Sequence, residues 1–424
     1  MHIAFFFALY KAMNVVTNVQ TNSFPNAPTK ILWQQVWGLA ALLAAITFSW
    51  IAYGFYQPRI LARIGFVDLA IWLGIFQGLL GAIVEPIVGW FSDRILGRFG
   101  SRLPQIVVGV TLAGLIFVVA SWLVETQLAE GMRWIVPVMM TMWVIAMIIF
   151  RGPAIALLQG FAPTNQLPQA NAILALVLAV TSATSPILGL ILKQIGASMT
   201  FILGAIALLI GSVLLWASMP RHLVTATSPE VSTTKLTAKS LVLYALPFVV
   251  GLGSGLEINL LLHILPRHLF QALGSLSIEY IQSAILLIAG IATLPLRSLL
   301  KSLFRRHQVT FGMGIGLAAI SGCLTLTVLS QNGVYLIFMS AIAAMALGLV
   351  LTNTIPLALA MVPPNQAGFG TGLYFGGNGM ATAVFAALFV TQGEISSMNG
   401  ALLCVFALAI ALISLKKFVE TIKS

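Results

Sequence analysis

Long apolar stretches follow one another along almost the whole chain, with short polar turns between them. A helix needs roughly 20 apolar residues to cross a bilayer core of about 30 Å. A window of that length predicts an all-α membrane protein with twelve spans, at 33–56, 69–91, 104–123, 134–158, 170–192, 198–219, 240–263, 276–296, 310–329, 334–357, 367–391 and 398–416.

The longest polar interval between spans separates six predicted spans from the other six. The predicted organisation is an N-terminal cytoplasmic segment, a six-helix bundle, a cytoplasmic linker, a second six-helix bundle and a tail, at 1–32, 33–219, 220–239, 240–416 and 417–424. The apolar start of the chain is too short to span, and no small-residue cleavage site marks a signal peptide. We favour translation from Met13, with Met1 as the alternative.

Composition agrees with a chain that faces lipid. Hydrophobic residues make up 59% of it and charged residues 7%, whereas a soluble domain carries about 25% charged residues. The net charge of +11 comes from Lys and Arg spread thinly between apolar runs, so it does not indicate nucleic-acid binding. With both termini cytoplasmic, that side carries fifteen Lys and Arg residues against five opposite. We expect this orientation in a bacterial-type plasma membrane.

Two short patterns recur between the halves. A basic triplet follows the second span and returns 203 residues later after the eighth, as Arg94, Arg98, Arg102 and then Arg297, Lys301, Arg305. The run APTNQ at 162–166 returns 200 residues later as VPPNQ at 362–366. Two such halves, related by an axis along the membrane normal, place a solute site between them near the midplane. Rocking of the halves then exposes that site to each side in turn.

The loop after the second span carries a dense motif of glycines and charges, comprising Gly89, Asp93, Arg94, Gly97, Arg98 and Arg102. Gly89 permits close approach of another helix, and Asp93 can accept hydrogen bonds from basic groups and from a helix N-terminus. Such a cluster can latch the cytoplasmic ends of the two halves. The motif resembles the signature loop of the major facilitator superfamily. The second-half copy lacks the acid, since Leu296 precedes Arg297, so its latch is expected to be degenerate.

A closer resemblance covers about residues 48–190. It is carried by Phe48-Ser49-Trp50, Ile71-Trp72-Leu73, Glu85-Pro86-Ile87-Val88-Gly89, Gly152-Pro153 and Ala170-Asn171, which look like the sucrose and glycoside-cation symporter branch. The resemblance implies sugar import driven by a proton or sodium gradient, with Asn171 on the solute pathway. The carboxylates that plant sucrose carriers place in and after the fourth span have no counterpart at 144–160.

Three ionisable residues lie well inside predicted spans, namely Glu85, Arg151 and Glu257. A charge at the bilayer centre costs at least about 2.5–3.5 kcal/mol, so each must face protein or water, or be neutral. Glu85 and Arg151 should lie at similar depth and form an ion pair, either structural or in substrate binding or coupling. Glu257 has no basic residue within a turn, which favours its neutral form. It is either a proton carrier or a neutral carboxyl bonded to a neighbouring helix, with Asn259 beside it on the pathway.

Two other sets of residues each have two interpretations, one functional and one structural. Trp50, Tyr53 and Gln57 share one helical face, where they contact a sugar or anchor the membrane interface. Glycines cluster before Glu257 and in the eleventh span, where they serve close packing or bending.

The sequence therefore predicts a secondary active transporter for a small polar solute, a sugar or glycoside by resemblance, coupled to H⁺ or Na⁺. The alternatives are an efflux carrier for apolar compounds and a transport-inactive, facilitator-like protein that assists membrane-complex assembly. Motifs of hydrolases, zinc proteases and nucleotide-binding loops do not occur, so we expect no enzyme. We also expect no cofactor, metal or nucleic-acid partner, and a monomer in the bilayer.

Overall fold

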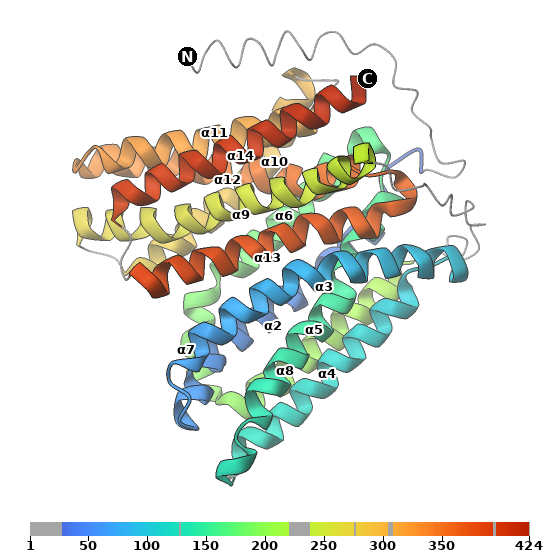
Figure 1. Ribbon diagram of the computed structural model, residues 1–424, viewed down its shortest axis with the longest axis vertical. Helices are drawn as coiled ribbons and strands as arrows, with labels where there is room; N and C mark the ends of the chain where they lie inside the picture. Colours follow the sequence, from blue (N-terminus) through green and yellow to red (C-terminus); the bar gives the residue numbers. More distant parts are fainter. Residues whose placement is uncertain are drawn as a thin grey trace.

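The computed structural model describes residues 28–126, 129–219, 238–274, 277–303, 308–392 and 396–423. These residues are almost entirely helical, and Figure 1 shows two groups of long helices. Both candidate start positions, most of the N-terminal segment and most of the predicted 220–239 linker lie outside the described residues. The division into two domains therefore stays a prediction.

Each predicted span corresponds to helix in the described chain. The first group contains α2 (Trp33–Arg63), α3 (Leu69–Phe99), α4 (Leu103–Glu125), α5 (Ile135–Ala156), α6 (Leu167–Ala183), α7 (Ser185–Ile195) and α8 (Ala197–Ser218). The second group contains α9 (Ala238–Leu273), α10 (Ile278–Leu303), α11 (Gln308–Val328), α12 (Gly333–Ala360), α13 (Ala367–Gln392) and α14 (Ser397–Lys423). In the described residues, eleven helices are long and apolar enough to cross a membrane; the glycine-rich α13 is not among them.

The fifth predicted span is two helices rather than one. α6 ends and α7 begins around Thr184, just before Pro186. Proline has no N–H for the carbonyl four residues earlier, and it disfavours helical backbone in the residue before it. Most other helices extend past their predicted ends, as α14 does to Lys423. A hydropathy window ends a predicted span where polar residues begin, whereas the backbone hydrogen bonds of the helix continue through those polar residues.

One hydrophobic core lies mostly in the first group and reaches side chains of α12 and α13, and another lies within the second group. In the first core the ring of Trp143 stacks on those of Tyr53 and Phe117, with centroids 4.5 Å apart in both pairs. In the second core Tyr374 is fully buried and its hydroxyl lies 2.7 Å from that of Ser254. Aromatic stacking makes the first group a firmly packed unit.

The repeated APTNQ and VPPNQ runs have the same local structure. Each forms a short 3₁₀ turn, over Thr164–Gln166 and Pro364–Gln366. In each, the N–H of the glutamine donates to the carbonyl of the first proline at 2.8 Å. The internal repeat read from the sequence is therefore confirmed at this position. Arg297 and Lys301 continue α10, while Arg305 lies outside the described residues.

Candidate functional site

The two groups meet along α3 and α13, whose backbones touch. A methyl group added at Gly89 would lie 2.1 Å from the carbonyl oxygen of Gly368, and one added at Gly372 would lie 2.3 Å from that of Glu85. The contact extends to Gly78, where an added methyl group would lie 2.9 Å from the methyl of Ala383. We call the end of the molecule that carries Asp93 and the two 3₁₀ turns the closed end. Figure 1 shows the two groups diverging away from it.

Asp93 ties the two groups together at the closed end. Its two carboxylate oxygens accept the main-chain N–H groups of Gly368 and Phe369, each at 2.8 Å. Arg102 donates to the same carboxylate at 2.5 Å. The first N–H groups of a helix have no partner within it, and the helix dipole favours an anion there. The predicted helix-terminus contact of Asp93 is thus present, and its receptor is the start of α13.

The remaining residues of the motif, Arg94, Gly97 and Arg98, lie within α3. The guanidinium of Arg94 lies 3.7 Å from the centre of the Trp90 ring, and Arg98 lies in the last turn of α3, where a cation is favourable. Gly97 lies inside this helix. Gly100 ends it with a φ of 67°, which glycine adopts readily, and the chain then turns back so that Arg102 reaches Asp93.

A second contact between the groups joins α6 to α10 and α12. The side-chain amide of Asn171 donates to the carbonyls of Leu351 and Thr352, at 3.0 and 2.8 Å. The Thr293 hydroxyl lies within 3.1 Å of the Ala172 carbonyl. Asn171 was expected on the solute pathway, but its side chain is fully buried in the contact between the groups.

The predicted ion pair between Glu85 and Arg151 is present and lies beside α13. Arg151 donates to a carboxylate oxygen of Glu85. The Glu85 side chain is 2% exposed and that of Arg151 is 27% exposed, so Arg151 is the partner that faces open space. Its guanidinium also lies 5.2 Å from the centre of the Phe375 ring of α13. Whether the pair acts in binding or coupling stays a prediction.

Gln77 is a polar residue of this region that the sequence reading missed. The Tyr53 hydroxyl and the Gln77 side chain are hydrogen-bonded, with 2.8 Å between the hydroxyl and the amide nitrogen, and Gln57 lies 3.5 Å from the same amide. Gln77 precedes Glu85 by eight residues, two turns earlier on the same face of α3. The sequence could have pointed to Gln77, because it lies on the same face of this helix as Glu85.

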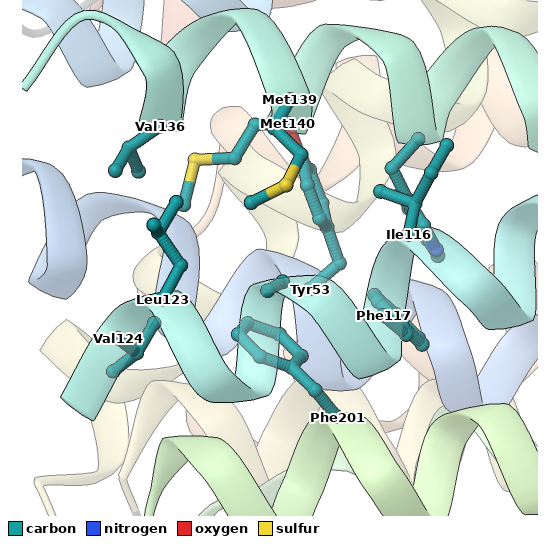
Figure 2. Close-up of a pocket in the computed structure, with 11 residues that line it drawn as sticks. Tyr53, Ile116, Phe117, Leu123, Val124, Val136, Met139, Met140 and Phe201 are labelled. Atoms are coloured by element: carbon teal, nitrogen blue, oxygen red, sulfur yellow. The ribbon is translucent and has the colours of Figure 1, made fainter. Parts of the chain in front are cut away.

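The aromatic face of α2 packs inside the first group. One face of the Tyr53 ring is covered by Trp143, and the Trp50 ring meets Trp143 edge-on with centroids 5.1 Å apart. Figure 2 shows a cavity beside Tyr53 that is surrounded by apolar side chains of α4, α5 and α8. Its volume is about 20 Å³, close to that of a single water molecule. It is too small for a sugar.

Glu257 lies inside the second group. α9 contacts α13 through Gly251 and Gly255, and α14 through Gly253. Glu257 is one turn after Gly253 and therefore points to the α14 side, where it is fully buried. The Ser321 hydroxyl of α11 lies beside its carboxyl, and none of the ion pairs among the described residues includes Glu257.

The Asn259 amide donates to the Gly255 carbonyl of its own helix at 2.8 Å. The α13 glycines at 368, 372, 376, 377 and 379 all touch neighbouring helices, which agrees with a role in close helix packing.

Within the described residues, no three or more His, Cys, Asp and Glu side chains gather as a metal site would require.

The family model described as Major Facilitator Superfamily matches residues 145–387. The chain belongs to the major facilitator superfamily. With this membership and its many apolar helices, this facilitator is a multi-pass integral membrane protein of the transporter type.

Solved structures resemble this facilitator over most of its length. One is a bacterial homologue of the iron transporter ferroportin in an outward-facing state, with a TM-score of 0.66 and 15% identity over 93% of this chain and 99% of that one. Another is the same kind of homologue with soaked iron, with a TM-score of 0.64 and 15% identity over 93% of this chain and 100% of that one. At this identity the likeness shows the fold alone. No curated protein matches the chain.

Proposed function

We propose that this facilitator is a secondary active transporter that moves a small polar solute by alternating access. The observation that carries the proposal is the bonding of Asp93 across the two groups at one end, while the groups diverge toward the other. The excess of Lys and Arg at the closed end favours a cytoplasmic location for that end and for both termini. The molecule then faces outward.

A sugar or glycoside is the first solute to test, with H⁺ or Na⁺ as the coupling ion. The resemblance at 48–190 supports this class, and Gln77, Glu85 and Arg151 supply hydrogen-bonding groups beside α13. We propose a monomer in a bacterial-type plasma membrane as the working unit. Efflux of apolar compounds is the rival function, since few polar side chains lie along the spans.

The proposal is tested with purified protein. A thermal-shift screen of sugars, glycosides and apolar compounds selects solutes that stabilise the chain. Uptake of each selected solute is then measured in liposomes with and without an imposed proton or sodium gradient. Gradient-driven accumulation of a polar solute supports the proposal. Transport of apolar compounds alone supports the efflux carrier, and no transport of any stabilising solute supports the inactive protein.

Asp93→Asn is expected to slow transport about tenfold, the equivalent of roughly 1.4 kcal/mol, with solute affinity nearly unchanged. The substitution weakens the two bonds to the start of α13, which join the groups at the closed end, and the bond to Arg102 within the first group. Initial uptake rates in liposomes and equilibrium binding measure the two effects. Arg94→Gln is the matched control, because Arg94 packs on Trp90 of its own helix. Normal turnover with weakened binding would contradict this role.

Glu257→Gln is expected to abolish gradient-driven accumulation but preserve solute exchange, if protons are the coupling ion. Glu85 is held by Arg151, whereas the buried Glu257 carboxyl forms no ion pair among the described residues, so its charge can change during the cycle. Counterflow and accumulation assays on the same liposomes separate the two modes. Full accumulation by the variant eliminates Glu257 as the proton carrier, and loss of both modes favours a structural or binding role.

A further inference from the structure

We propose that Asn171 is a switching residue, which stabilises the closed end by bonding a carbonyl of the opposite group that Pro356 leaves without a helical donor. The inference rests on the proposed alternating access. It assigns Asn171 to the equilibrium between conformations rather than to solute binding.

The first observation is the gap in the hydrogen bonding of α12. In an α-helix the carbonyl of Thr352 accepts from the N–H of the residue four positions later, and that residue is Pro356, which has no N–H. A buried carbonyl without a donor costs free energy comparable to a lost hydrogen bond. The Asn171 amide, from α6 of the other group, fills this gap at 2.8 Å.

The second observation is a counterpart in the first group. Pro153 of α5 precedes Pro356 by 203 residues, the same displacement as the basic triplets. The carbonyl that Pro153 leaves without a helical donor is that of Ile149, and Gln105 of α4 donates to it at 3.1 Å. The two halves therefore have the same gap. In α5 the donor comes from within the group, and in α12 it comes from across the contact.

This difference has a consequence for switching. When the groups separate at the closed end, the bond from Gln105 moves with its group and is kept. The bonds from Asn171 to Thr352 and Leu351 are lost, and the Thr352 carbonyl is left without its donor. Asn171 thus stabilises the conformation in which the two groups meet at the closed end. The strength of its bonds helps to set the equilibrium between this conformation and the one in which that end is open.

The test uses spin labels and needs no solute. A closed-end pair is placed at the exposed positions Asn165 and Pro364, and an opposite-end pair at Val67 and Val334. Distance distributions are measured by pulsed electron paramagnetic resonance in liposomes. Asn171→Leu is expected to raise the population with a long closed-end distance about tenfold relative to wild type. Asn171→Ala replaces it if the leucine variant does not fold.

Two controls separate switching from general loss of stability. Gln105→Leu removes the equivalent bond inside the first group, so it is expected to lower thermal stability without changing the distance populations. Pro356→Ala gives α12 its own donor for Thr352 and should reduce the effect of Asn171→Leu to about threefold or less. An undiminished tenfold effect in the Pro356→Ala background would overturn the assignment.

Two further outcomes distinguish this inference from the function on which it rests. If wild type populates both states and Asn171→Leu leaves their proportions unchanged, the switching role is wrong and alternating access stands. If wild type and every variant keep one distance at each end, the switching role and the proposed function are both wrong.

Discussion

Removal of one member of the Glu85–Arg151 pair is expected to destabilise the protein by roughly 3–5 kcal/mol, because it leaves an uncompensated buried charge. Arg151→Gln strands a carboxylate that is 2% exposed and should lie near the top of this range. Glu85→Gln strands a guanidinium that is 27% exposed and should lie near its lower end. The double variant Glu85→Gln/Arg151→Gln replaces both charges with neutral amides and should recover most of the loss. Reversible unfolding in mixed micelles, monitored by circular dichroism, gives the three free energies.

Arg133→Gln is the matched control for this series. Arg133 lies 3.8 Å from Glu130, and their side chains are 38% and 89% exposed. Exposed pairs contribute only about 0–1 kcal/mol, so this variant should unfold almost like wild type. A double variant less stable than either single variant would contradict a compensating pair and point to separate roles for the two residues.

Gly89→Ala and Gly372→Ala are each expected to open the closed end. The added methyl groups would lie 2.1 and 2.3 Å from main-chain oxygens of the facing helix. Overpacking of this kind costs about 1–3 kcal/mol, and only the conformation in which α3 and α13 touch bears it. For the closed-end spin-label pair, the ratio of the long-distance to the short-distance population should therefore rise about tenfold or more.

Two other glycines control for helix propensity and for packing within a group. Gly81 lies on α3, and a methyl group there meets nothing within 4 Å, so Gly81→Ala should leave the distances unchanged. Gly251→Ala would place its methyl group 2.1 Å from the Tyr374 carbonyl oxygen inside the second group. It should lower thermal stability without opening the closed end. A uniform response of all these variants would count against a specific effect at the α3–α13 contact.

Hydropathy and spacing along the chain predicted the helices and the internal repeat well, because both are local properties of the sequence. The Glu85–Arg151 contact was also predictable, since two opposite charges at one depth in a bilayer have few other ways to be compensated. The break at Thr184 was missed because an apolar window passes over Pro186 without registering the missing N–H.

The sequence did not reveal which groups meet across the contact. The partners of Asp93 are main-chain N–H groups at 368 and 369, and any helix start offers such groups. Asn171 likewise bonds main-chain carbonyls, so its role depended on a proline nearly two hundred residues away. Glu257 was placed on the pathway from its depth and from the lack of a basic residue within a turn, whereas the direction in which it points depends on how the glycines of α9 pack.

The most direct test of the central claim, alternation of one pathway between two sides, compares both spin-label pairs on the same protein in liposomes. The account predicts two distances at each end, with populations that change in opposite directions when a stabilising solute or a proton gradient is applied. In Gly372→Ala, the closed-end pair should lengthen while the Val67–Val334 pair shortens. One fixed distance at each end under all these conditions, or lengthening of both pairs together, would contradict alternating access.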